Sequence, residues 1–290
     1  MDFVAELNER VTQLPKQPHD RLQGKPLRLR SLFISDVHLG FPGCSAEFLC
    51  DFLDQVDCDF LYLVGDIVDF HYMRNRRFWP ASHSDVVQKI LEIACAGSRV
   101  IYIPGNHDDS LRRFCDLAFG HIEVKAQAIH ESADGRRFLV IHGDQFDSAI
   151  RFSPLLSMIG TWTYDGLLRI NAWVNATRRW LGMDYWSLVA FLKHRVKNAM
   201  RYVTRFEEAA LRAADKERVD AVICGHIHRA EISTAEALAY MNCGDWVESC
   251  TALMEHDDGR MELMQWRERS TSLKAAYIPQ FESLAGKQAA

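Results

Sequence analysis

The sequence has no cysteine pair in Cys-x-x-Cys spacing and no long apolar segment. Its eight cysteines are scattered and several lie in apolar segments, so we expect reduced thiols and no disulfide framework. No stretch reaches the roughly 18 to 20 apolar residues of a membrane span, and residues 1–27 lack the apolar core of a secretion signal. These absences predict a cytoplasmic protein, with any contact at the inner membrane being peripheral.

An excess of positive charge is also missing. The formal net charge of −5 argues against a general nucleic-acid binder, so we expect no nucleic-acid partner. The chain has 290 residues, 48% of them hydrophobic, and this is enough to bury the core of one large domain.

What the sequence does contain is a series of short clusters of metal-ligating side chains. The clusters are, in chain order, Asp36-Val-His38, Gly65-Asp66-Ile-Val-Asp69, Gly105-Asn106-His107-Asp108, His142-Gly-Asp144 and Gly225-His226-Ile-His228. Carboxylates, an amide oxygen and imidazoles bind hard or borderline divalent ions, and the set contains no thiolate. The pattern therefore favours catalytic manganese, iron, zinc or magnesium over structural zinc.

Each cluster follows an apolar, strand-like run within a few residues. The runs are Leu29 to Ile34, Phe60 to Val64, Val100 to Ile103, Arg137 to Ile141 and Val219 to Cys224. Ligands in open α/β sheets bind at the carboxyl ends of the strands. We therefore expect the clusters to converge at one edge of a sheet.

With these motifs, the chain resembles the calcineurin-like metallophosphoesterase superfamily from about Leu29 to Trp266. The resemblance implies an α/β fold, a four-layer α/β/β/α sandwich, and two divalent ions, most often manganese, with iron or zinc as options. It implies one metal held by Asp36, His38, Asp66 and His228. It implies a second metal held by Asp66, Asn106, His142 and His226. Two cations that share a carboxylate can clamp a phosphoryl group and activate a water molecule.

The resemblance also implies catalytic roles next to the ligands. His107 and Asp108 resemble the imidazole–carboxylate pair that stabilises the phosphoryl group or protonates the leaving oxygen. Asp69 is expected to orient a ligand histidine by accepting its second ring proton, and a loop cap is the alternative for Asp69. The alternative for His107 is an exposed loop histidine.

The gap of 83 residues between His142 and His226 is long for a minimal phosphoesterase. Apolar residues at helical spacing between Phe152 and Ala214 predict an inserted helical cap. We place the boundaries at 1–27 for an N-terminal lead-in, 28–268 for the phosphoesterase domain with its cap at about 145–215, and 269–290 for a C-terminal tail.

The composition of the cap region differs from that of the whole chain. Residues 145–218 hold nine Arg and three Lys against four Asp and three Glu, a net charge of +5, together with four of the seven tryptophans. Apolar walls with basic rims suit an anionic, phosphate-bearing small molecule or lipid, or an anionic bilayer surface. The alternative is that the aromatic rings pack the helices together and the cations are solvated. The candidate substrate-binding residues are Trp173, Arg178, Arg179, Lys193 and Lys197.

The motif order, the insertion and the segment Asn242-Cys243-Gly244-Asp245-Trp246 are similar to the branch of UDP-2,3-diacylglucosamine pyrophosphatases. Members of that branch release UMP and 2,3-diacylglucosamine 1-phosphate in lipid A biosynthesis. They have Arg where this chain has His107, so the substrate stays open. A phosphomonoesterase or a Ser/Thr-type protein phosphatase of the same superfamily is the alternative. A scaffold that has lost catalysis is disfavoured because all eight residues of the catalytic pattern are present.

Overall fold

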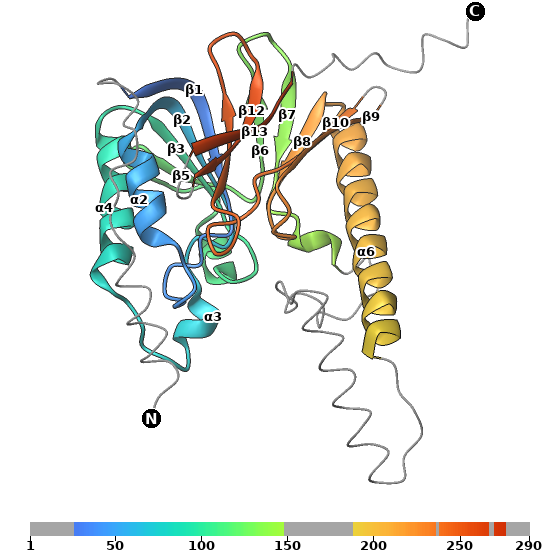
Figure 1. Ribbon diagram of the computed structural model, residues 1–290. Helices are drawn as coiled ribbons and strands as arrows, with labels where there is room; N and C mark the ends of the chain where they lie inside the picture. Colours follow the sequence, from blue (N-terminus) through green and yellow to red (C-terminus); the bar gives the residue numbers. More distant parts are fainter. Residues whose placement is uncertain (1–25, 148–187, 236–237, 267–269, 277–290) are drawn as a thin grey trace, which may run out of the picture.

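The computed structural model describes residues 26–147, 188–235, 238–266 and 270–276 (Figure 1). Two β-sheets pack face to face, with α2 and α4 outside the first sheet and α6 outside the second. This is the four-layer α/β/β/α sandwich predicted from the sequence. The part of the predicted cap between residues 148 and 187 lies outside the described residues.

The larger sheet has eight strands in the order β13-β12-β11-β1-β2-β3-β5-β4, and β1, β2 and β3 run parallel. Its strands are β1 (Leu27–Ile34), β2 (Val56–Val64), β3 (Arg99–Ile103), β4 (Ala118–Phe119), β5 (Ile122–Val124), β11 (Thr251–Glu255), β12 (Met261–Trp266) and β13 (Ser270–Ala276).

The smaller sheet has five strands in the order β6-β7-β8-β10-β9, and β7, β8 and β10 run parallel. Its strands are β6 (Ala128–Glu131), β7 (Arg137–Val140), β8 (Ala221–Cys224), β9 (Glu231–Ala235) and β10 (Leu238–Asn242). The two inner faces bury side chains such as Phe33, Val64, Phe138 and Ile223 between the sheets.

The helices bury apolar stripes against the outer faces. In α4 (Ala81–Cys95), Val86, Ile90 and Ala94 recur every four residues and are buried, as expected for an amphipathic helix. The remaining helices are α2 (Ala46–Asp54), α3 (Phe70–Met73), α6 (Leu188–Glu217) and the 3₁₀ helices η1 (Asp109–Phe114) and η2 (Asp144–Phe146). None of the helices among the described residues is long and apolar enough to cross a membrane.

All five strand-like runs form strands: five of the ten ends coincide, four shift by one or two residues, and β2 begins four residues earlier than predicted. The expectation that they share one sheet was wrong. The first three form β1, β2 and β3 of the larger sheet, and the last two form β7 and β8 of the smaller one. An apolar run shows that a strand is buried, but not which of two packed sheets it joins. The clusters converge because the carboxyl ends of both groups of parallel strands face the same end of the sandwich.

Of the C-terminal strands, β11 and β12 follow from the sequence, whereas β13 lies where a C-terminal tail was predicted. Apolar runs on both sides of Asp257-Asp258-Gly259 are typical of a hairpin with an Asp-Gly turn, and β11 pairs antiparallel with β12 across these residues. The predicted tail, residues 269–290, begins with β13, which pairs with β12.

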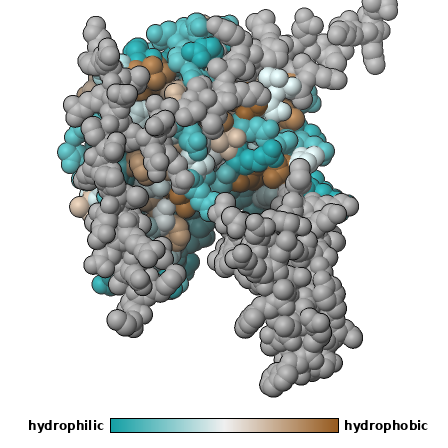
Figure 2. All heavy atoms as spheres, viewed as in Figure 1, coloured by the Kyte–Doolittle hydropathy of each residue, from teal (hydrophilic) through white to brown (hydrophobic). Residues whose placement is uncertain are grey.

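Hydrophobic residues on the visible described face are scattered among hydrophilic ones (Figure 2).

A buried polar network lies between the two sheets. The carboxylate of Glu255 on β11 accepts hydrogen bonds from Ser31 Oγ at 2.7 Å and from the backbone N–H of Ala133 at 2.7 Å. Its Oε2 atom lies 2.6 Å from His130 Nε2 on β6, and Tyr62 Oη lies 3.1 Å from His130 Nδ1. The network therefore links β1, β2 and β11 of one sheet to β6 of the other.

We expect Glu255→Ala to lower the free energy of unfolding by about 3 to 5 kcal/mol, because it leaves the buried His130 without its anionic partner. Burial would raise the pKa of Glu255, but the bond to His130 outweighs it, and the pKa is lowered from 4.5. The contribution of this carboxylate is thus present above pH 4.5 and is lost as the pH falls.

Urea unfolding at pH 7 and pH 4 checks this prediction, with Glu131→Ala on the exposed face of β6 as the control. The control should stay within about 0.5 kcal/mol of the wild type. A loss below 1 kcal/mol for Glu255→Ala at pH 7, or a loss that grows as the pH falls, would contradict it.

Candidate metal centre

The pairing of β1 with β2 continues past the ends of both strands and sets the positions of the first ligand-bearing loops. Asp36 donates its backbone N–H to Gly65 O at 3.0 Å, and His38 donates to Asp66 O at 2.9 Å. The two Asp-containing motifs, 30 residues apart in the chain, are therefore held side by side by backbone hydrogen bonds. Asp36 and Asp66 are both almost completely buried.

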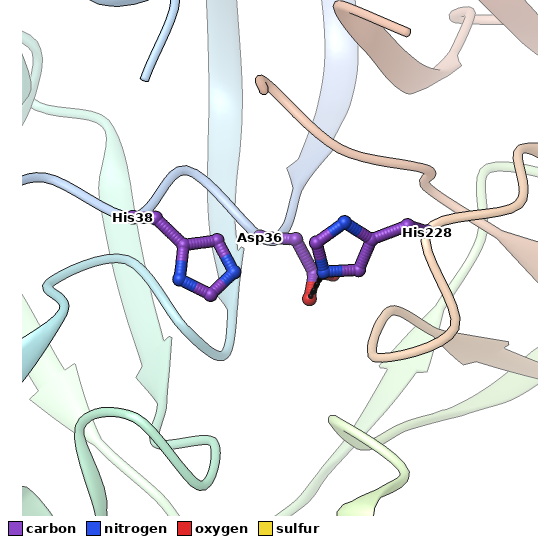
Figure 3. Close-up of side chains that lie close together, drawn as sticks. All are labelled: Asp36, His38 and His228. Carbon is purple, nitrogen blue, oxygen red and sulfur yellow. Dashed lines mark ion pairs between the residues drawn. The ribbon is translucent and has the colours of Figure 1, made fainter. Parts of the chain in front are cut away.

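The first group of possible ligands is Asp36, His38 and His228, whose ligand atoms all lie within 4.8 Å of one another. Figure 3 shows the carboxylate of Asp36 between the two imidazole rings. His228 Nε2 lies 3.1 Å from Asp36 Oδ1. His38 Nδ1 lies 3.2 Å from Asp69 Oδ2, so its other ring nitrogen faces the site.

The second group is Asp66, His142 and His226, whose ligand atoms lie within the same 4.8 Å limit. His142 Nδ1 donates to Val64 O at 3.0 Å, and this bond leaves Nε2 for the site. That nitrogen lies 3.3 Å from Asp66 Oδ2 and 3.3 Å from Asn106 Oδ1. Asn106 thus joins the second group, as the sequence predicts.

Asp66 links the two sets of residues. Besides its place with His142 and His226, it forms a third group with His38 and His107. The backbone N–H of His107 donates to Asp66 Oδ1 at 2.7 Å. The structure therefore brings all seven predicted ligands together around Asp66, the residue expected to bridge.

Many of these residues have a strained backbone. Eight non-glycine residues among those described have a positive φ, and five of them are predicted ligands: Asp36, His38, Asp66, His226 and His228. The left-handed region is unfavourable for residues with a Cβ atom, and such residues concentrate at functional sites. The sharp turns it produces aim consecutive ligands at one point.

Glycine at position 105 leaves room for two of the ligands. A Cβ atom there would lie 2.7 Å from His142 Cδ2 and closer still to Asp66 Oδ1. Gly105 is needed because these side chains pass directly over the backbone, and its backbone conformation alone does not require glycine. The Gly-Asn-His motif is thereby explained by close approach as well as by ligation.

The charges of the site are strongly coupled. Burial alone would lower the pKa of His142, but the neighbouring Asp66 outweighs it and raises the pKa to about 10. The pKa of His228 rises to about 9 for the same reason, with Asp36 as the partner. Burial opposes ionisation of Asp36, yet His228, His142 and His38 hold its pKa below the usual value. The carboxylates are thus ionised and demand compensating positive charge.

One predicted pair is corrected. His107 Nδ1 lies 3.0 Å from Asp69 Oδ1, so its carboxylate partner is Asp69 and not Asp108. Burial would lower the pKa of His107, but Asp69 and Asp66 outweigh it and raise the pKa. Asp69 Oδ2 also lies 3.2 Å from His38 Nδ1, as expected for a residue that orients a ligand histidine. Its Oδ1 accepts the backbone N–H of Tyr72 at 2.7 Å as the N-cap of α3, so the loop cap predicted as the alternative is present as well.

Asp108 is fully buried and binds the loops that carry the ligands. It accepts hydrogen bonds from Gly105 N at 2.6 Å, Ile67 N at 2.8 Å and Tyr102 Oη at 2.6 Å. Sequence adjacency to His107 suggested a pair, but in the turn after Gly105 the two side chains have different partners.

Two residues near the site were not predicted. Asp147 Oδ2 lies 2.9 Å from His226 Nε2, and Tyr202 Oη on α6 donates to Asp147 Oδ1 at 2.6 Å. Asp147 follows the His142-Gly-Asp144 cluster by three residues, and that proximity is the only sequence feature that could have identified it. Tyr202 lies 60 positions after His142, and only tertiary structure connects it to the site.

The substrate-binding candidates are less well defined. Trp173, Arg178 and Arg179 lie outside the described residues. Lys193 and Lys197 lie four residues apart in α6. On the other side of the site, next to His107, a cavity of about 420 Å³ is lined by Phe70, His71, Met73, Arg74, Asp109 and Ser110. The His71 and His107 rings are 5.1 Å apart, so this cavity adjoins the site.

The residues present fit bound divalent cations. The buried His38 Nε2 has no hydrogen-bond partner among the described residues. Each of the two linked groups combines a buried carboxylate with imidazole nitrogens, a donor set typical of manganese, iron or zinc. The second nitrogens of His38 and His142 are held by Asp69 and by a backbone carbonyl, as is usual for metal-ligating histidines.

The chain is similar to one protein family and to several solved structures. A model of the family described as calcineurin-like phosphoesterase matches residues 29–230. Of the similar solved structures, the Escherichia coli phosphoesterase Yfce is 14% identical (TM-score 0.45, 86% of this chain and 98% of that one). An archaeal phosphodiesterase is 13% identical (TM-score 0.36, 84% of this chain and 99% of that one). Zinc-bound Vps29 from Entamoeba histolytica is 12% identical (TM-score 0.39, 85% of this chain and 97% of that one). No curated protein matches the chain significantly.

Substitution of Asp69 should lower activity with little loss of stability, whereas substitution of Asp108 should lower stability. We expect Asp69→Asn to lower kcat/KM on a chromogenic phosphodiester by about 10- to 100-fold, because two histidines lose their anionic partner. The same change should alter the free energy of unfolding by less than about 1 kcal/mol, since Asn can still cap α3. Asp108→Ala should cost about 3 kcal/mol or more, because it leaves buried N–H donors without acceptors.

Steady-state kinetics and urea unfolding of the two variants measure this contrast. Wild-type turnover by Asp69→Asn would show that Asp69 does not contribute to activity. Unchanged stability of Asp108→Ala would refute the structural role of Asp108.

Proposed function

The chain belongs to the calcineurin-like phosphoesterase family, and we propose that it hydrolyses the pyrophosphate bond of UDP-2,3-diacylglucosamine, a step in lipid A biosynthesis. The products would be UMP and 2,3-diacylglucosamine 1-phosphate. As a member of the family, it is a metal-dependent hydrolase of phosphoric ester bonds. The proposal adds the substrate, manganese as the metal and a peripheral position at the inner membrane.

One observation carries the reaction class. Two groups of carboxylate and imidazole ligands adjoin each other, and Asp66 lies where they meet. In the proposed assignment Asp36, His38, Asp66 and His228 hold one ion. Asp66, Asn106, His142 and His226 hold the other. Bound divalent ions supply Lewis acidity and lower the pKa of a water molecule.

The remaining residues orient and neutralise the reacting groups. His107 belongs to a ligand group with His38 and Asp66, and its ion pair with Asp69 favours the protonated imidazole. A protonated imidazole in this place can stabilise negative charge on the phosphoryl group or donate a proton to the leaving oxygen. Asp69 keeps His107 and His38 in fixed orientations.

Support for the lipid substrate comes from the insertion and from the motifs. The cap region carries a net charge of +5 and four tryptophans, which suits acyl chains joined to a phosphate. The cavity next to His107 offers space for the other half of the substrate, with Arg74 as a cation on its wall. The lipid part and the uridine part of the substrate would then each have a place beside the metal centre.

A phosphomonoesterase or Ser/Thr-type protein phosphatase activity is the alternative. His107 supports it, because the pyrophosphatase branch resembled by this chain has Arg at that position. Such an enzyme would use the same metal centre but would release inorganic phosphate from its substrate.

With UDP-2,3-diacylglucosamine and manganese, we expect the enzyme to release UMP, and chelation by EDTA should abolish the release. Asp66→Ala should reduce the rate to background, because both proposed metal sites lose a ligand. Product analysis by mass spectrometry, with Glu131→Ala as the surface control, checks this. Release of phosphate from phosphomonoesters without any UMP from the lipid substrate would favour the alternative.

The cap is expected to act on the lipid half of the substrate. Trp173→Ala should lower kcat/KM for the lipid by roughly tenfold or more, because a buried aromatic side chain contributes about 1.5 to 3 kcal/mol to apolar contact. Turnover of a small chromogenic phosphodiester should be nearly unchanged. Equal losses on both substrates, measured side by side, would show that the cap has a structural role only.

A further inference from the structure

His226 contacts two other predicted ligands, Asp36 and His142, and two residues outside the predicted metal-binding set, Phe206 and Asp147. Its backbone N–H donates to Asp36 Oδ2 at 2.9 Å. Its ring stacks on Phe206 of α6, with the ring centroids 6.0 Å apart. Its Nε2 atom lies 2.9 Å from Asp147 Oδ2. The orientation of this imidazole therefore depends on residues outside the predicted metal-binding set.

Asp147 is itself fixed by α6. Tyr202 donates its hydroxyl proton to Asp147 Oδ1 at 2.6 Å, and Tyr202 precedes Phe206 by one helical turn. Phe206 is fully buried, so this part of α6 is anchored in the core. One carboxylate oxygen of Asp147 thus faces the Tyr202 hydroxyl and the other faces the His226 ring.

We propose that Asp147, held by Tyr202, is a positioning residue for the second metal. By accepting the Nε2 proton of His226 it fixes the tautomer in which Nδ1 is unprotonated. Nδ1 is then the atom that joins Asp66, Asn106 and His142 as a ligand. Carboxylate partners of ligand histidines typically raise metal affinity by 10- to 100-fold. The inference rests on the dinuclear centre proposed above.

The arrangement mirrors that of the first metal. There Asp69 contacts His38 Nδ1 at 3.2 Å, and here Asp147 contacts His226 Nε2 at 2.9 Å. Asp69 comes from the loop after β2, within the core of the domain. Asp147 and Tyr202 fall within the range 145–215 predicted for the cap, but Tyr202 lies on α6, which packs on the smaller sheet as an outer layer of the sandwich. The second metal would therefore depend on α6, and the first would not.

Manganese binding to the full-length chain tests the proposal without any substrate. Equilibrium dialysis with metal analysis should show two ions per wild-type chain. Asp147→Ala should raise the dissociation constant of one site at least tenfold and leave the other within twofold. Asp147→Asn keeps an oxygen acceptor and should stay within threefold of the wild type. The spin-coupled dimanganese signal in electron paramagnetic resonance should weaken in Asp147→Ala at limiting manganese and return in Asp147→Asn.

Asp59→Ala is the matched control, because Asp59 is also about half exposed and ion-paired, on β2 before the site. It should bind two ions as the wild type does. Unchanged affinity of both sites in Asp147→Ala would overturn the proposal. If circular dichroism shows that Asp147→Ala is unfolded, Tyr202→Phe decides: a rise of threefold or more at one site supports the proposal and no rise refutes it. A wild-type chain that takes fewer than two ions would instead contradict the dinuclear centre itself.

Discussion

Two carboxylates buried side by side, Asp36 and Asp66, are the constraint on which the rest of the site depends. Hydrogen bonds between the loops after β1 and β2 fix their positions before any ligand is considered. Buried charges of the same sign are costly unless they are neutralised. Imidazoles with raised pKa values neutralise them in the protein alone, and two divalent cations would do so in the enzyme.

Local backbone strain accompanies the placement of these two buried carboxylates. Five predicted ligands have a backbone in the left-handed region. Position 105 is a glycine because a Cβ atom there would collide with the side chains of His142 and Asp66. Asp108 supplies part of the compensation by accepting hydrogen bonds from N–H groups of the loops after β2 and β3. Stability and chemistry are thus divided between neighbouring residues. Asp108 holds the loops together, whereas Asp69 orients the imidazoles.

Much of the site could be predicted from the sequence because each ligand directly follows an apolar strand. Asp36 and Asp66 follow β1 and β2 at almost constant spacing, and parallel strands end at the same edge. Assignment of the strands to two sheets could not be predicted, since β3 and β7 have equally apolar sequences. The pairing of His107 with Asp69, and of His226 with Asp147 and Tyr202, depends on side-chain direction in tertiary structure. Sequence adjacency favoured Asp108 instead.

In the proposed site, this member of the family binds two cations, one on either side of Asp66. Anomalous diffraction from crystals soaked in manganese can locate both ions. We expect two peaks about 3.5 to 4 Å apart, with the carboxylate of Asp66 between them. A single peak, or peaks away from Asp66, would contradict it.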